Sequence, residues 1–196
     1  MPKARKLNLM VASTVYNFQD QLGQICATLK GYGYNVWNSH LGTIPQHPGL
    51  SNLKNCAAGA GDCDLFLGII RPSYGSGVVG KRSITHEECR KAVNLKKPRW
   101  FLVHHDVVIA RQLLKSHLYT KDGKRTKFIL RENPVIDDVR VIDLYNDVIQ
   151  QEIPLVDRKG HWAQEFSRID EILTYIDAQL GDEKRIRRIC KEMAKQ

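Results

Sequence analysis

A run of six residues from Leu65 to Ile70, LFLGII, is apolar throughout except for one glycine. Such a run is typical of a strand that is buried on both faces of a parallel sheet. Shorter apolar runs at residues 6–12, 34–37 and 100–103 alternate with segments of helical periodicity. Alternating strands and helices form βαβ units with right-handed crossovers. The sequence therefore predicts an α/β fold, a doubly wound three-layer α/β/α sandwich with a mainly parallel sheet.

Three helices are predicted between these strands. Phe18, Leu22, Ile25 and Leu29 recur at helical spacing before glycines at positions 31 and 33, and further helices are expected at residues 53–60 and 83–95. These elements form an expected core at residues 6–105.

The second half of the chain is less regular. Residues 106–160 are predicted to form an irregular insertion, in which 107–118 has helical spacing and 139–149 fits a strand or a helix. A closing amphipathic helix is expected over 161–180, which completes one domain over 1–180. Residues 181–196 then predict a basic amphipathic tail helix, whose apolar stripe needs a partner from this domain or from another chain. The stripe consists of Ile186, Ile189, Cys190 and Met193.

Composition indicates a cytoplasmic protein. Of 196 residues, 42% are hydrophobic and 26% charged, as in ordinary globular proteins, and the apolar run before Ser13 is too short for a secretory signal or a membrane span. The five cysteines are odd in number and never spaced as C-x-x-C, which indicates reduced thiols. A metal cluster of Cys56 and Cys63 with a histidine can be imagined, but buried thiols explain both residues more simply. We therefore expect no metal site and no membrane contact.

The net charge of +9 is concentrated in basic blocks at residues 3–6, 81–99 and 181–196. The blocks are interspersed with acids and lack interleaved aromatic residues, so we expect a solvated basic face rather than a nucleic-acid partner.

Ligands of open α/β sheets bind beyond the carboxyl ends of the strands, so the loops there are the candidate site. Ser13 and Thr14 end the first strand, where two hydroxyls and the N–H groups of a helix N-terminus suit phosphate or ribose. The same two residues also fit a simple helix cap.

A second loop, at residues 71–77, holds Arg71 and Tyr74 with two glycines. An arginine can form bidentate hydrogen bonds with a carboxylate or phosphate, and a tyrosine can stack on a ligand or donate a hydrogen bond from its hydroxyl. The spacing from Gly75 to Gly80 and Lys81 approaches a P-loop, but position 82 is arginine where a magnesium-binding hydroxyl is required. We therefore exclude a Walker-type NTPase.

Ser83, Thr85 and Glu88 open the third predicted helix. Thr85-x-x-Glu88 has the spacing of a capping box, in which the glutamate only reaches back to the backbone of the cap. In the functional alternative, the Glu88 carboxylate holds ribose hydroxyls or attacks an anomeric carbon. His104, His105 and Asp106 end the fourth strand near the same edge, and we expect them to play at most a supporting role.

The motifs at positions 11–18, 64–75 and 83–98 together resemble the family known as domain of unknown function 4062. They read VAST-x3-F, DLFLGII-x3-YG and S-x-T-x2-E-x3-A-x4-KP, and Trp162-x3-Phe166 resembles the closing element of that family. The resemblance implies a TIR-like or nucleoside deoxyribosyltransferase-like fold, with a flavodoxin- or TIR-like sheet, and a role in signalling or defence. Some members of these related groups cleave N-glycosidic bonds with one glutamate, which corresponds here to Glu88.

The resulting hypothesis is a nucleotide-recognition domain that cleaves the N-glycosidic bond of NAD, a nucleotide or a nucleoside. Glu88 is the expected catalytic residue and no cofactor is required. Ligand binding is expected from Ser13, Thr14, Arg71, Tyr74, Ser83 and Thr85. The alternative is a non-catalytic interaction module that forms a homo-oligomer through its tail helix. A nucleotide-sized cavity at Glu88 favours the first hypothesis, and a filled site in which Glu88 caps the helix favours the second.

Overall fold

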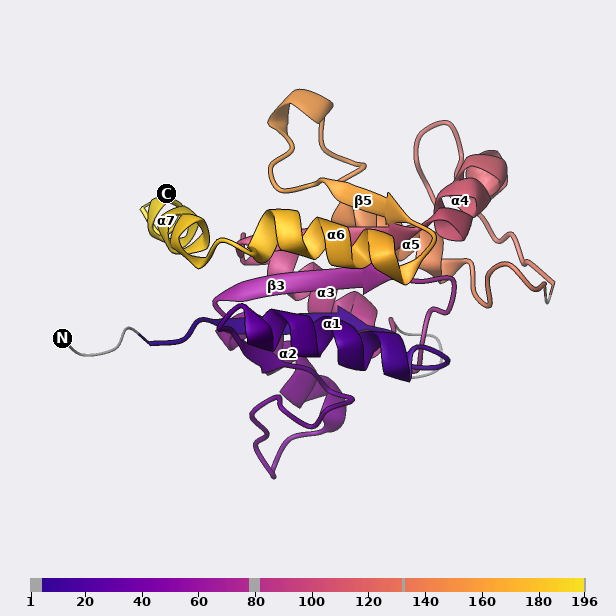
Figure 1. Cartoon of the computed structure of the whole chain (residues 1–196). Helices are drawn as coiled ribbons and strands as arrows, with labels where there is room; N and C mark the ends of the chain where they lie inside the picture. The colour runs from indigo at the N-terminus through magenta and orange to yellow at the C-terminus, as the bar shows by residue number, and fades with distance from the viewer. Residues whose placement is uncertain (1–4, 78–81, 132, 196) are drawn as a thin grey trace.

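The computed structural model describes residues 5–77, 82–131 and 133–195. Its strands form one parallel sheet in the order β2-β1-β3-β4-β5, and Figure 1 shows the central strand β3 in the middle of the molecule. This is the flavodoxin-like order of doubly wound folds, so the predicted parallel α/β sandwich is confirmed. The strands are β1 (Asn8–Ser13), β2 (Asn35–Trp37), β3 (Leu65–Ile70), β4 (Arg99–His104) and β5 (Ala163–Phe166).

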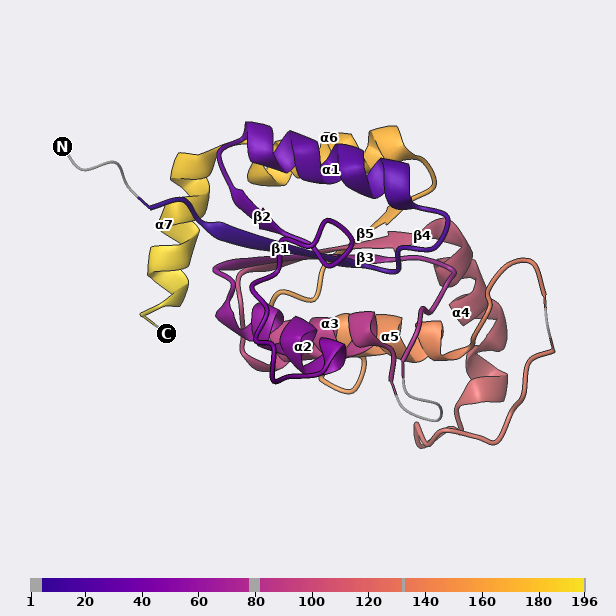
Figure 2. The same ribbon diagram turned by 90° about the horizontal axis from the view of Figure 1, so that it is seen from below.

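Helices cover both faces of the sheet (Figure 2). One face carries α1 (Gln19–Gly31) and α6 (Ile169–Leu180), and the other carries α2 (Asn52–Asp62), α3 (Ile84–Asn94) and α5 (Arg140–Val148). Every residue of β3 is buried, as the apolar run predicts for a central strand. The predicted apolar stripe of α1 also faces the core, where Phe18, Leu22, Ile25 and Leu29 are buried.

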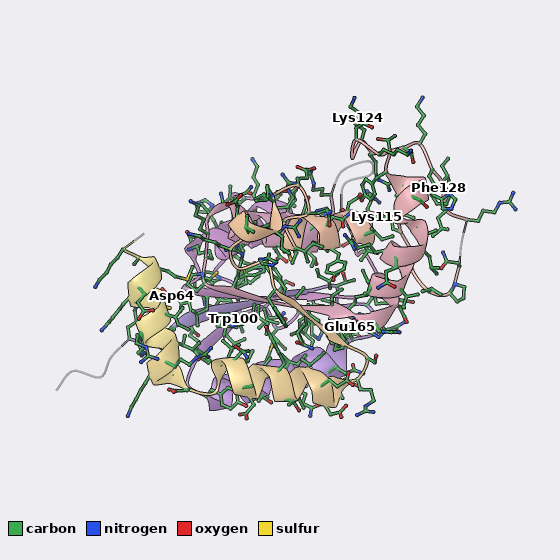
Figure 3. The ribbon with its side chains drawn as sticks, turned by 90° about the horizontal axis from the view of Figure 1, so that it is seen from above. Asp64, Trp100, Lys115, Lys124, Phe128 and Glu165 are labelled. Carbon is green, nitrogen blue, oxygen red and sulfur yellow. The ribbon has the colours of Figure 1, made fainter. Side chains whose placement is uncertain are left out.

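The segment expected as an irregular insertion contains two regular helices, α4 (His105–Leu118) and α5. Residues 139–149, which fit a strand or a helix, form α5 because Val141, Ile142, Leu144 and Val148 are buried at helical spacing against the sheet. The segment between these two helices contains Lys124 and Phe128, which lie at the end of the molecule opposite the C-terminal helix (Figure 3).

The prediction of one continuous helix over 161–180 is wrong at its start. Residues Ala163–Phe166 form β5, which pairs with β4, and α6 begins only at Ile169. Positions four apart share a face both in a helix and in a strand, so Trp162 and Phe166 fit either pattern. Phe166 is buried under α6, whereas Trp162 is 69% exposed.

The tail helix α7 (Glu183–Met193) packs against its own domain. Asp182 caps it by accepting a hydrogen bond from the Arg185 N–H, at 3.0 Å. Ile186 is buried, and Ile189 and Cys190 pack against the core between the sheet and α1 and α6. This domain therefore supplies a partner for the predicted apolar stripe. In the described ranges, no helix is both long enough and apolar enough to cross a membrane.

Candidate active site

A cavity of about 600 Å³ opens where the carboxyl ends of β1 and β3 meet. The chain leaves β1 toward α1 on one face of the sheet and leaves β3 toward α3 on the other face. Ligands of doubly wound sheets bind at this type of switch point, and the volume lies within the range of small-molecule sites. Four of the predicted site residues line the cavity: Ser13, Thr14, Thr85 and Glu88.

Ser13 and Thr14 lie at the end of β1 and are nearly buried. The Ser13 hydroxyl donates to the Thr14 carbonyl at 3.3 Å, whereas the Thr14 hydroxyl has no hydrogen-bond partner among the described residues. The Thr14 side chain faces Gly75, where an added Cβ would lie 2.9 Å from Thr14 Oγ1. Gly75 also has a φ of +86°, which favours glycine. The loops after β1 and β3 therefore meet at this pair.

Glu88 reaches the cavity from the second turn of α3 and is 3% exposed. Burial raises the pKa of its carboxyl group to about 8, and a hydrogen bond with the Cys56 thiol lowers it in part. The pKa of the Cys56 thiol is itself raised to about 12, first by burial and then by the nearby Glu88 charge. A buried carboxyl group with a perturbed pKa in a cavity is typical of a functional site.

The capping box predicted for Thr85 and Glu88 is wrong. Ser83 caps α3 instead, and its Oγ accepts a hydrogen bond from the His86 N–H at 3.3 Å. The Glu88 carboxyl group contacts the Cys56 thiol rather than the backbone of the first turn. Helix capping therefore does not account for a glutamate at position 88.

Arg71 does not line the cavity but holds the loop that follows β1. Its guanidinium donates to the carbonyls of Thr14 at 3.2 Å and Tyr16 at 2.7 Å, and it lies 4.3 Å from the centre of the Phe18 ring. Burial lowers the pKa of Arg71. Arg71 therefore fixes the conformation of the loop after β1, which forms part of the cavity wall.

Tyr74 is also placed behind the cavity wall. It is 2% exposed, and its hydroxyl lies 2.7 Å from His86 Nδ1 and accepts a hydrogen bond from the Ser83 N–H at 3.2 Å. The Tyr74 N–H donates to Asp137 Oδ1, at 2.8 Å, and Asp137 lines the cavity. Tyr74 and Ser83 therefore fix the start of α3 relative to the β3 loop.

The segment between β2 and α2 supplies cavity residues that sequence reasoning missed. Gln46 and Asn52 line the cavity, and their amides have no hydrogen-bond partner within the described ranges. Asn55 is buried and holds this segment, since its Oδ1 accepts from the His47 N–H at 2.8 Å and its Nδ2 donates to the carbonyls of His47 and Leu50 at 3.2 Å. The available signal was Asn55, a polar side chain next to the small apolar run that begins at Cys56.

The remaining candidates lie elsewhere. His104 caps α4 by accepting from the Asp106 N–H at 3.2 Å, and His105 contacts Glu165. The Cys63 thiol contacts the Ala60 carbonyl at 3.4 Å. Across the described residues, no three His, Cys, Asp or Glu side chains are grouped so that they could hold a metal ion. Gly80 and Lys81 of the near P-loop spacing lie outside the described residues.

Fold and cavity together define a doubly wound α/β domain with a cavity at the β1–β3 switch point. The family described as Domain of unknown function (DUF4062) matches residues 8–180, and the chain belongs to this family. No curated protein matches the chain.

Proposed function

We propose that this domain binds a nucleoside-like ligand in the β1–β3 cavity and cleaves its N-glycosidic bond with Glu88. The observation that carries the proposal is the buried Glu88 carboxyl group, which lines a cavity of about 600 Å³ and does not cap its helix. A volume of this size accommodates a nucleoside. The resemblance to TIR domains and nucleoside deoxyribosyltransferases supports the same role for this glutamate.

The polar groups around Glu88 suit a sugar and a base. Hydroxyls of Ser13, Thr14 and Thr85 can exchange hydrogen bonds with ribose, and the amides of Gln46 and Asn52 can pair with the edge of a base. In the described part of the lining there are two acids, Glu88 and Asp137, and no lysine, arginine or histidine. This lining favours an uncharged nucleoside over a polyphosphate, so we place nucleosides before NAD and nucleotides as substrates.

In the proposed reaction, the ionised Glu88 carboxylate attacks the anomeric carbon of the sugar. The bond from that carbon to the base nitrogen breaks, its electron pair leaves with the base, and the base takes a proton from water. The hydroxide formed from that water then attacks the anomeric carbon of the glycosyl ester, the bond from that carbon to the Glu88 oxygen breaks, and the carboxylate is restored. Because the pKa of Glu88 is about 8, the nucleophilic form increases as the pH rises toward and through that value.

The test is incubation of purified protein with a panel of nucleosides, nucleotides and NAD, followed by chromatography of the released base. Wild type is compared with Glu88→Gln and with Glu87→Gln. Glu87 is the matched control because it is the adjacent glutamate of α3 but lies outside this cavity, 3.5 Å from Arg82. We expect release by wild type and by Glu87→Gln, with a loss of at least about a thousandfold in Glu88→Gln.

Binding without turnover is measured by the ligand-induced rise in melting temperature. A rise with nucleosides that Glu88→Gln retains, without release, would restrict the proposal to recognition. If no ligand is cleaved and none raises the melting temperature, the proposal fails and a non-catalytic interaction module becomes the better account.

A further inference from the structure

A second cavity, of about 350 Å³, lies at the opposite end of the sheet from the Glu88 site. It is formed where β4 and β5 begin and where the second half of α6 crosses them, and its walls include Trp100, Trp162 and Tyr175. Figure 3 shows Trp100 on the half of the molecule nearer α7, while Glu165 lies on the half nearer α4. This cavity is therefore independent of the proposed glycosidic site.

Arg99, the first residue of β4, supplies a positive charge to this cavity. Its guanidinium donates to the carbonyls of Lys97 at 3.1 Å and Lys159 at 2.7 Å, and Nε is buried without a hydrogen-bond partner among the described residues. Burial lowers the pKa of Arg99, and within the described ranges no carboxylate pairs with it. Charges that are taken out of water in proteins are normally paired, but this partly buried guanidinium has no carboxylate counter-ion among the described residues.

Apart from Gly160, the other described residues that line the cavity are aromatic or carry side-chain amides, and none of them is an acid. Trp162 is 69% exposed, and its Nε1 lies 3.4 Å from Gln164 Oε1. The segment before it stands out beyond β5 as a loop (Figure 1) and exposes Leu155 and Val156. Tryptophan, tyrosine and arginine are the residue types most enriched among the hot spots of binding sites.

We propose that this cavity binds a carboxylate carried on an aromatic ring, with Arg99 as the counter-ion and Trp162 as the surface for the ring. Guanidinium groups bind carboxylates through charge-assisted hydrogen bonds, and indole rings stack on aromatic groups. The volume lies at the lower end of ligand sites, which fits one ring and its carboxylate. A free aromatic acid and the C-terminal aromatic residue of a peptide both have this chemistry.

The experiment titrates the full chain with phenylacetate and with the tripeptide Gly-Gly-Phe, each beside its neutral amide. Tryptophan fluorescence reports binding because two of the three tryptophans line this cavity, and calorimetry provides the affinity. We expect saturable binding of at least one acid, with the matching amide at least about tenfold weaker. Binding of phenylacetate indicates a free acid, and binding of the peptide alone indicates a peptide terminus.

Arg99→Gln is compared with Arg158→Gln, which is a matched control. Arg158 holds the same loop through the carbonyls of Ile153 at 2.7 Å and Gln151 at 3.1 Å, but it does not line the cavity. Arg99→Gln should lose the preference for acid over amide, and Arg158→Gln should keep it. Arg99→Lys retains the positive charge, so it should keep part of the preference for acid over amide. If Arg99→Gln does not fold, Arg99→Lys is compared with wild type instead.

Three results would overturn the proposal. The first is the absence of saturable binding by either acid, and the second is equal affinity of wild type for acid and amide. The third is an equal loss in Arg99→Gln and Arg158→Gln, which would show that both arginines act only by holding the loop.

Discussion

The Tyr74 hydroxyl lies 2.7 Å from His86 Nδ1, which joins the loop after β3 to the first turn of α3 inside the domain. On the other side of the imidazole, Nε2 lies 3.0 Å from Asp147 Oδ2 on α5, and Arg90 donates to the same carboxylate at 2.7 Å. These contacts connect the cavity wall, the helix that carries Glu88 and the neighbouring helix. The orientation of Glu88 therefore depends on groups that do not line its own cavity.

Replacement of Tyr74 by phenylalanine removes the hydroxyl and leaves the Ser83 N–H and the His86 ring without this partner. We expect Tyr74→Phe to lower the free energy of unfolding by about 1–3 kcal/mol, the usual cost of unsatisfied buried polar groups. Urea denaturation measures this change. Tyr16→Phe is the control, since Tyr16 is 70% exposed, and it should change stability by less than about 0.5 kcal/mol. Equal stability of the two variants would contradict a structural role for the Tyr74 hydroxyl.

The contact between Gly75 and Thr14 can be tested with an added methyl group. Gly75→Ala places a Cβ 2.9 Å from Thr14 Oγ1 at a φ of +86°, whereas Gly123→Ala has a similar φ of +79° with no atom within 4 Å. Both variants incur backbone strain, so the difference between them isolates the contact. We expect Gly75→Ala to be less stable than Gly123→Ala by about 1–3 kcal/mol in urea denaturation. Identical losses would indicate that the two loops do not press together.

Most of the sheet could be predicted from the sequence because the strands β1 to β4 each have a local signal. The apolar run of β3 and the short runs at β1, β2 and β4 mark buried strands, and their alternation with helices requires parallel pairing. The segment at β5 could not be assigned in the same way. It has four residues, its helical and strand periodicities coincide, and only pairing with β4 distinguishes them.

The site could be predicted in part. Ser13, Thr14, Thr85 and Glu88 follow from the rule that function lies at the carboxyl edge of the sheet, and they line the cavity. Arg71 and Tyr74 lie in the loop after β3 but do not line the cavity. Carbonyls of the loop after β1 bind the Arg71 guanidinium, and the His86 ring binds the Tyr74 hydroxyl. These partners are distant in sequence, so local spacing contains no information about them. Gln46 and Asn52 were missed because they come from the segment after β2, which only the tertiary fold brings to this cavity.

The tail helix offers a test of whether α7 is part of the domain. Ile186 is fully buried against the core beside α1 and α6, so Ile186→Ala should lower the free energy of unfolding by about 2–5 kcal/mol. Ile129→Ala removes the same atoms from a side chain that is 86% exposed, and it should have little effect. Urea denaturation of both variants measures the difference. A small loss for Ile186→Ala would mean that α7 leaves the domain readily and that its apolar stripe is available to another chain.

The buried Glu88 carboxyl group predicts a specific dependence of stability on pH. Its pKa is about 8 in the folded domain, against an ordinary value of 4.5 in the unfolded chain, so the folded state binds more protons between these values. The contribution of Glu88 to stability is therefore fully present below pH 4.5 and is lost as the pH rises through about 8. Glu88→Gln cannot titrate, so it should lose this dependence and be more stable than wild type above pH 8.

Melting temperatures measured across this pH range test the prediction, with Glu87→Gln as the control that should follow wild type. Parallel curves for wild type and Glu88→Gln would show that the carboxyl group is hydrated and ordinary. If the curves diverge as expected, ionisation of Glu88 costs folding free energy, because burial opposes the charged form. A ligand that offers hydrogen bonds or developing positive charge to the carboxylate would recover part of this cost. The same pH range should then show substrate cleavage increasing while the stability of the free protein decreases.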